Sequence, residues 1–237
     1  MGEPTSRESR PAASGRAPED AVGARLRTLG PQSMLVGVQV VQGIALSLLV
    51  LHLLDLSRSA GGLAWGDWLF ADVAFMCIAS TFYFHLLLAA VLPVPPSINQ
   101  IMIPLTIGAC AIALARTFDQ PATFFWLYLA YVAISIVGFA YTAWHNARGT
   151  VAGLDTTMRE ALATECRKNI ACLALMGIVT LILAIGYPTG ARSGPRDLAF
   201  VAINAGVFVY MMWRTETRFA RQVRALAAAV PAEPGRH

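Results

Sequence analysis

The 237-residue chain contains 56% hydrophobic and only 14% charged residues, and its net charge at pH 7 is +4. Ordinary soluble domains carry about 25% charged residues, so this composition excludes a soluble globular protein and is typical of a membrane protein. The excess of basic residues does not indicate a nucleic-acid partner. These residues lie in the tails and in one loop beside apolar runs, where the orientation of a membrane chain explains them.

Residues 1–32 are rich in Pro, Gly, Ser and charged residues and contain little that folding would bury. We expect a disordered tail here, because such a segment cannot offset the entropy lost on ordering. A signal peptide has a short apolar core close to its start. The first apolar run begins only near Met34 and is long enough to span a bilayer, so we expect the tail to be retained.

Six apolar windows follow the tail, each near the ~20 helical residues that cross a ~30 Å hydrocarbon layer. They lie near residues 33–54, 68–92, 98–115, 122–144, 169–187 and 198–213. The sequence therefore predicts an all-α fold, a bundle of about six transmembrane helices over residues 33–213. The third window contains Pro104, and its re-entry on one side of the membrane is the alternative to a full crossing.

The first window carries a stripe of small and polar residues. Gln39, Gly43 and Ser47 recur every four residues, with Gln42 beside them. Such a stripe allows helices to approach closely and to form hydrogen bonds across their interface. The other interpretation is a solute path, because Gln39, Gln42 and Asn204 of the sixth window lie within about one helical turn of the bilayer midplane.

His52 and Asp72 are unusual residues for apolar segments, and they lie near the end of the first window and the start of the second. At 1.5 Å rise per residue, both lie roughly 12 Å from the midplane on the outer side. We therefore expect a hydrogen bond or ion pair between them. Alternatively, Asp72 reaches headgroup water and His52 caps the first span.

His85 is the deepest ionisable residue in the second window. At 100° per residue it lies nearly opposite Asp72, so we expect the second helix to have protein neighbours on two faces and a central place in the bundle. An ionisable residue inside a membrane indicates a functional site. The competing interpretation is a neutral histidine that is hydrogen-bonded to a carbonyl or to Ser or Thr.

The loop at residues 145–168 is basic and polar. Thr157 and Glu160 have the spacing of a capping box, in which each side chain bonds a backbone N–H of a starting helix. The loop therefore predicts a short cytoplasmic helix that leads into the fifth span.

The tail at residues 214–237 is also basic and contains good helix formers. We expect it to continue the sixth span along the membrane surface, where Arg214, Arg218 and Arg221 contact lipid headgroups.

The basic residues also predict the orientation of the chain. In a six-span arrangement, fourteen of the 18 Lys and Arg residues fall on the side of both tails and the 145–168 loop, and four fall on the other. Basic residues are retained on the cytoplasmic side, so we expect both termini to be cytoplasmic, in the inner membrane of a bacterium. The expected partners are the lipid bilayer and either a second copy or another membrane-complex subunit.

No chemical motif accompanies these features. The four cysteines, Cys77, Cys110, Cys166 and Cys172, form no CxxC pair, and the histidines do not share the depth that a haem requires. There is no phosphate loop, HExxH, GxSxG or acidic metal cluster. The sequence therefore predicts no catalytic residue, no metal and no cofactor.

Three classes of function remain open. A small channel or transporter subunit comes first, because polar residues occur near the midplane in windows one, two, three and six. An auxiliary or sensor subunit of a membrane complex would use the Arg-rich tails as contact surfaces. A membrane-embedded enzyme would depend on His52, Asp72 and His85 as acid–base groups, and the sequence favours a protein that is not an enzyme.

Overall fold

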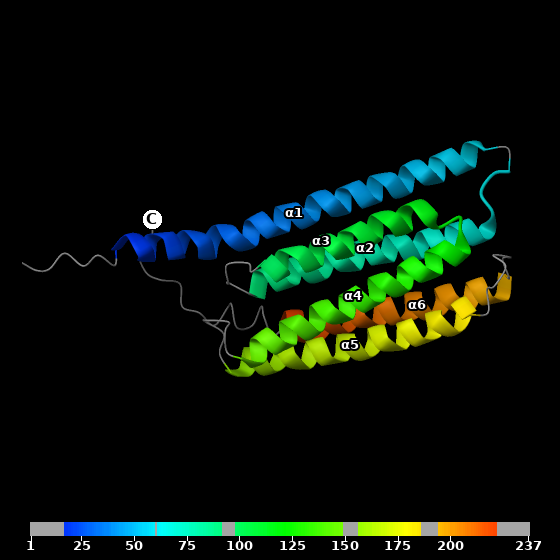
Figure 1. Ribbon diagram of the computed structural model, residues 1–237. Coiled ribbons are helices and arrows are strands. Elements are labelled where there is room, and N and C mark those ends of the chain that lie inside the picture. The colour runs from blue at the N-terminus through cyan, green and yellow to red at the C-terminus, as the bar shows by residue number, and fades with distance from the viewer. Residues whose placement is uncertain (1–16, 60, 92–97, 149–155, 186–193, 222–237) are drawn as a thin grey trace, which may run out of the picture.

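The computed structural model describes residues 17–59, 61–91, 98–148, 156–185 and 194–221, and within these ranges the fold is all-α, as predicted. The helices are α1 (Ala17–Arg58), α2 (Trp65–Val91), α3 (Ile98–Thr117), α4 (Pro121–Ala147), α5 (Thr156–Ile185), α6 (Gly194–Arg214) and a short π-helix, η1 (Thr215–Ala220). The six α-helices run alternately in opposite directions along one bundle (Figure 1).

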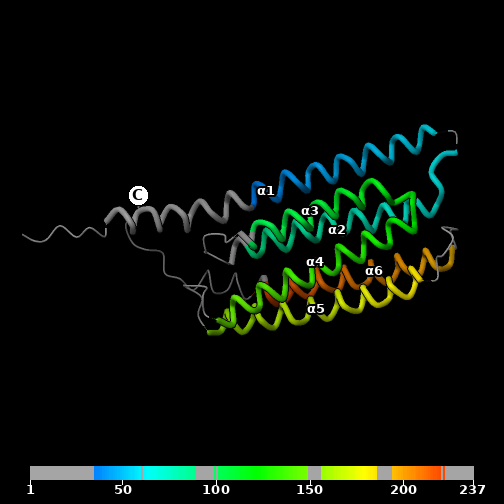
Figure 2. Tube along the Cα trace, in the orientation of Figure 1, coloured from blue at the N-terminus to red at the C-terminus, as the bar shows by residue number. Residues whose placement is uncertain are grey.

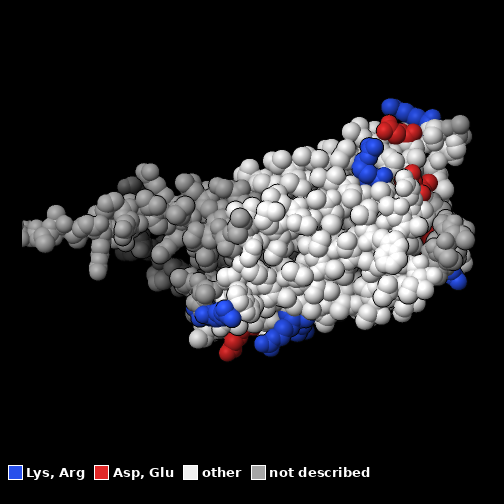
Figure 3. Space-filling model, in the orientation of Figure 1, with Lys and Arg blue, Asp and Glu red and all other residues white. Residues whose placement is uncertain are grey.

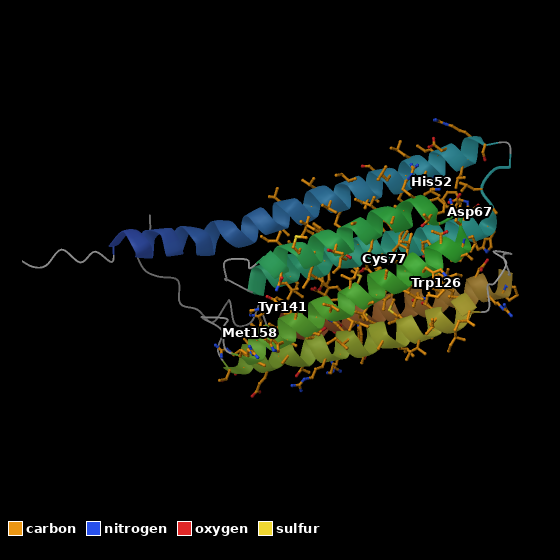
Figure 4. All side chains as sticks on the ribbon, in the orientation of Figure 1. His52, Asp67, Cys77, Trp126, Tyr141 and Met158 are labelled. Atoms are coloured by element: carbon orange, nitrogen blue, oxygen red, sulfur yellow. The ribbon has the colours of Figure 1, made fainter. Side chains whose placement is uncertain are left out.

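The bundle has two ends, which we name by residues that lie there. At the His52 end, α1 ends and α2 begins, and Figure 4 shows His52 and Asp67 at this end. At the opposite Arg214 end, α6 passes into η1, and Figure 4 places Tyr141 and Met158 there. With six crossings, the start of α1 and the end of α6 lie at the same end of the bundle (Figure 1).

The helices have the length and the surface that a bilayer requires. Five of the described helices are long and apolar enough to cross a membrane, and α3 has a shorter apolar stretch, Ile101–Thr117. On the visible face, the charged side chains of the described residues gather toward the two ends and leave the middle uncharged (Figure 3). Large apolar side chains such as Val40, Ile182 and Val209 are exposed on the helices, as expected of a surface in contact with lipid.

Helix α3 crosses the whole bundle and does not re-enter. It is continuous through Pro104, and the chain passes from the end of α2 at one end of the bundle to the start of α4 at the other (Figure 1). Small residues allow its close packing: Gly108 faces Val41 of α1, and Gly138 of α4 faces Ile103 of α3. A side chain at Gly108 would overlap Val41.

Helix α1 begins earlier than the sequence predicted. It starts at Ala17, so residues 17–32 are helical where we expected a disordered tail. Pro18 follows directly after this start, and proline has the right backbone angle for the first turn of a helix. The remainder of the predicted tail, residues 1–16, lies outside the described residues.

The helix expected in the 145–168 loop is confirmed, because α5 begins at Thr156 and continues without a break into the fifth span. At the other terminus, η1 continues α6 beyond Arg214, and the rest of the basic tail from residue 222 lies outside the described residues. Figure 2 shows the resulting arrangement: α1 lies at one edge beside α2 and α3, and α4 lies beside α5. Helix α2 packs against α1, α3 and α6, which confirms its central place.

Candidate functional site

A series of buried polar side chains follows the interior of the bundle between α2, α4, α5 and α6. We call it the polar column, and its members are Tyr128, Asn204, Ser80, Thr81, Tyr131, Tyr83, Glu216, Glu165, Asn169, Arg214 and Thr215. All are buried except Tyr83 and Glu216, which are half-buried. Polar groups inside a membrane protein need hydrogen-bond partners, because the hydrocarbon supplies none.

The column begins in the half of the bundle nearer the His52 end. Tyr128 of α4 donates a hydrogen bond of 2.6 Å to Asn204 Oδ1 of α6, and Asn204 Nδ2 donates to the carbonyl oxygen of Phe200. Asn204 is fully buried, so both ends of its amide are satisfied inside the protein. This contact joins two helices that are far apart in the sequence.

Aromatic rings close the column toward the His52 end. Phe70 of α2 lies within 5.0 Å of Phe124 and 5.6 Å of Phe200, measured between ring centroids. Phe125 of α4 lies 4.8 Å from the ring of Phe200. All four rings are at most 1% exposed, so they form an apolar layer between the Tyr128–Asn204 contact and this end of the bundle.

The middle of the column joins α2 to α4. The hydroxyl groups of Tyr131 and Thr81 lie 2.9 Å apart, and Ser80 Oγ lies 3.4 Å from the Tyr131 hydroxyl. Tyr131 also donates to the carbonyl oxygen of Cys77 at 3.1 Å. Figure 4 shows Cys77 midway along the bundle, so this contact lies at the central depth.

His85 follows one turn further along α2. Its Nδ1 lies 2.7 Å from the carbonyl oxygen of Thr81, to which the imidazole donates. The interpretation of His85 as a histidine bonded to a carbonyl is therefore confirmed. Two residues before it, on the other face of α2, Tyr83 donates a hydrogen bond of 2.7 Å to Glu216 Oε2 of η1, which adds a polar contact nearer the Arg214 end.

The column ends in a buried ionic cluster, which consists of Glu165, Asn169, Arg214 and Thr215. Arg214 Nη2 donates to Glu165 Oε1 at 2.6 Å and to Asn169 Oδ1 at 2.5 Å. Thr215 Oγ1 donates to the same Glu165 oxygen at 2.5 Å. No member of the cluster is more than 8% exposed.

The ionic cluster is held by both helices of the last hairpin. Glu165 and Asn169 are four residues apart, so they lie on one face of α5. Arg214 is the last residue of α6, and Thr215 is the first residue of the π-helix. Short π-helices are rare and are frequently found at functional sites. Removing one partner of a buried ion pair typically costs about 3–5 kcal/mol, because the other charge remains uncompensated.

The structure corrects the predicted pair of His52 with Asp72. His52 Nε2 lies 3.0 Å from Asp119 Oδ1, in the turn between α3 and α4, and its ring packs against Phe118. Asp72 is on an exposed side of α2, whereas its neighbours Phe70 and Val73 are buried. The two residues are at the same end of the bundle, as expected. They do not meet, because Asp72 lies on a face of α2 that points away from the bundle.

The polar stripe of α1 is also placed differently from the prediction. Gln42 is buried, but Gln39, Gly43 and Ser47 are exposed on the side of α1 that faces away from the bundle. Ser47 Oγ bonds the carbonyl oxygen of Gly43 in its own helix. The stripe therefore does not mediate packing between α1 and the other described helices.

The predicted headgroup contacts divide into two groups. Arg218 and Arg221 are exposed, and headgroup contact stays a prediction for them. For Arg214 the prediction is wrong, because its side chain is buried in the ionic cluster. A basic residue next to a span usually anchors at the surface, but here an acidic residue on the neighbouring helix binds it inside.

Sequence reasoning missed several residues of the column. Glu165 and Asn169 were counted with the 145–168 loop or its border, although their spacing of four places them on one helix face. Tyr128 lies in the aromatic-rich start of the fourth window, a pattern typical of rings at a membrane border, but its ring is fully buried. Among the described residues, His, Cys, Asp and Glu side chains form no group of three that would hold a metal ion.

Comparisons with known proteins add no relative: no protein-family model, no curated protein and no solved structure matches the chain. The class of the protein therefore follows from its own structure. An all-helical bundle with five long apolar helices and a shorter sixth defines a multi-pass helical membrane protein.

Proposed function

We propose that this protein is a small transporter subunit that moves a polar solute along the polar column between α2, α4, α5 and α6. The observation that carries the proposal is a series of separate polar contacts at successive depths inside the bundle. These contacts occur between Asn204 and Arg214, a distance of about 15 Å along α6. Polar groups inside a membrane are costly, and they often mark a solute or ion path.

The packing of the column supports a transporter over an open channel. Its side chains bond one another, the four phenylalanine rings close it toward the His52 end, and the ionic cluster closes it toward the Arg214 end. A solute would pass only when these layers separate in turn. A protein with two such closures has the arrangement that alternating access requires.

For the orientation, we propose that the Arg214 end faces the cytoplasm of a bacterium and that the bundle lies in its inner membrane. This end carries the exposed basic residues Arg167, Lys168, Arg218 and Arg221. Basic residues beside membrane spans are retained on the cytoplasmic side.

Thiol labelling tests the transporter proposal without knowledge of the solute. Cys77 lies beside the column at the middle of α2, and Cys110 lies at the middle of α3 outside the column. Single-cysteine variants in membrane vesicles would be treated with a charged methanethiosulfonate, which reacts only where water reaches the thiol. We expect Cys77 to react slowly and Cys110 to remain unmodified. Equal protection of both thiols contradicts a water-accessible path along the column.

A second candidate is an auxiliary subunit of a membrane complex, and the exposed stripe of α1 favours it. Gln39, Gly43 and Ser47 face away from the bundle, and small and polar residues of this kind are enriched where membrane helices meet. If α1 docks a partner, Gly43→Leu would reduce the size of the complex in native membranes and leave the fold of the chain intact. A transporter that works alone would retain its labelling at Cys77 in this variant.

The third class, an acid–base enzyme, is disfavoured by the positions of its residues. His52 binds Asp119, Asp72 is exposed, and His85 lies roughly 20 Å from Asp72 along α2. The three groups therefore do not converge on one reacting centre.

A further inference from the structure

Two buried hydrogen-bond donors in the ionic cluster lack an acceptor among the residues that the structure describes. These are Asn169 Nδ2 and Arg214 Nε, and both are shielded from solvent. Asn169 is 0% and Arg214 is 2% exposed, so water outside the protein does not reach them. A buried N–H without an acceptor costs about 1–3 kcal/mol, and more when the donor is charged.

Both donors flank the same hydrogen bond. Arg214 Nη2 bonds Asn169 Oδ1, and the orphan Nε belongs to the same planar guanidinium. The orphan Nδ2 belongs to the amide whose oxygen accepts that bond. The orientation of the Asn169 amide is fixed by this contact, because a flipped amide would turn N–H groups toward the guanidinium. The two donors therefore belong to the two side chains that meet in this contact.

The chemistry of this region calls for an acceptor that carries negative charge. The guanidinium group of Arg214 repels a cation, so an anion is the ligand that fits beside it. Glu165 Oε1 already accepts from Arg214 and Thr215. Exposed basic residues at the same end, Arg167 and Lys168, add positive potential. Guanidinium groups bind carboxylates and phosphates particularly well, because their N–H groups match several oxygens at once.

We propose that the ionic cluster binds an oxyanion through Arg214 Nε and Asn169 Nδ2, next to the retained contact with Glu165. The ligand chemistry is that of a phosphate group, and its source is either a free anion or a lipid headgroup. If the ligand is a free anion, we infer that the solute of the proposed transporter is anionic. This inference about the solute rests on the transporter proposal. Binding itself does not depend on transport.

The test measures the unfolding temperature of the detergent-solubilised full chain as a function of ligand concentration. The ligands are inorganic phosphate, at an ionic strength held constant with NaCl, and dioctanoyl phosphatidylglycerol, with dioctanoylglycerol as the phosphate-free control. At a ligand concentration 100 times Kd, we expect the unfolding temperature to rise by on the order of 5 °C.

Two variants test the donors separately. Asn169→Asp keeps an oxygen that accepts from Arg214, replaces the amide donor with a second oxygen and adds a negative charge that repels an anion, while Arg214→Lys keeps the charge and removes Nε. We expect both to lose the response to ligand, and the control Arg218→Lys, in the exposed part of η1, to keep it. If Arg214→Lys does not fold, the Asn169→Asp variant alone tests the site, because residue 169 then still accepts a hydrogen bond from Arg214.

Each outcome has a defined meaning. A rise with inorganic phosphate that Asn169→Asp abolishes supports the site and a free anionic ligand. A rise only with phosphatidylglycerol, abolished by the same variant, supports the site with a lipid headgroup and contradicts the anionic solute. No rise with either ligand, a rise equal to that in NaCl alone, or a rise that survives in Asn169→Asp overturns the site. If Cys77 is as protected from thiol labelling as Cys110 while phosphate still binds, the transporter proposal is contradicted and the oxyanion site is supported.

Discussion

His52 of α1 bonds Asp119 in the turn between α3 and α4, with 3.0 Å between Nε2 and Oδ1. This contact ties the helix at the edge of the bundle to the turn at its His52 end. Helix α1 packs against α2 and α3. The His52–Asp119 contact adds a polar link at the His52 end of this helix. The side chains are 15% and 26% exposed, and the contact is therefore weaker than a fully buried ion pair.

The His52–Asp119 contact predicts a measurable coupling between the two residues. We expect His52→Ala and Asp119→Ala to lower the free energy of unfolding less than additively when combined, with a coupling of about 0.5–1 kcal/mol. Reversible unfolding in mixed micelles would measure this double-mutant cycle. Asp72→Asn serves as the control, and a larger coupling of His52 to Asp72 than to Asp119 would contradict the structure.

The ionic cluster predicts an unequal effect of single and double substitutions. Arg214→Met leaves Glu165 as a buried unpaired charge, and we expect it to lower the free energy of unfolding by about 3–5 kcal/mol. The double variant Arg214→Met with Glu165→Met should recover a large part of this loss, because no charge remains buried. Equal instability of the single and double variants would show that the charges do not compensate each other.

The close approach of α1 and α3 predicts that Gly108 tolerates no side chain. In Gly108→Ala the added Cβ overlaps Val41, whose branched side chain has little freedom to move, and we expect a loss of about 1–3 kcal/mol. Val41→Ala in the same chain should restore much of it. Gly43→Ala is the matched control on α1, where nothing lies within 4 Å of the added atom, and it should raise the unfolding temperature slightly, because alanine favours the helix.

The Tyr128–Asn204 contact predicts a loss on removal of a single hydroxyl group. Tyr128→Phe preserves the ring packing and leaves Asn204 Oδ1 without its donor, which should cost about 0.6–1.7 kcal/mol. Thermal unfolding followed by tryptophan fluorescence would measure the shift. Tyr210→Phe, at an exposed position of α6, is the control. An equal shift of the unfolding temperature in both variants would show that the bond between Tyr128 and Asn204 is not its cause.

The course of the helices could be predicted well from the sequence, because a run of apolar residues long enough to cross a bilayer leaves few alternatives to a helix. All six windows coincide with helices, and even the window that contains Pro104 crosses the bundle. The central place of α2 also followed from its pattern, because Thr81 and His85 lie on the opposite face from Asp72.

The contacts between helices could not be predicted in the same way. Helix phase shows which residues share a face, but it does not show which neighbour that face meets. The partner of His52 lies in a turn between two other spans, and the partner of Arg214 lies 49 residues earlier in the chain. Local rules place a basic residue at a span end on the membrane surface, so only the three-dimensional arrangement reveals Arg214 as buried.

The pairing of Glu165 with Arg214 also constrains how the protein is made. Glu165 precedes Arg214 by 49 residues, so the ribosome synthesises α5 before the residue that compensates its carboxylate. An ionised carboxylate within a membrane helix is costly to insert alone. We therefore expect the final hairpin to integrate as a unit, because a nascent chain that stops after α5 lacks the residue that compensates Glu165.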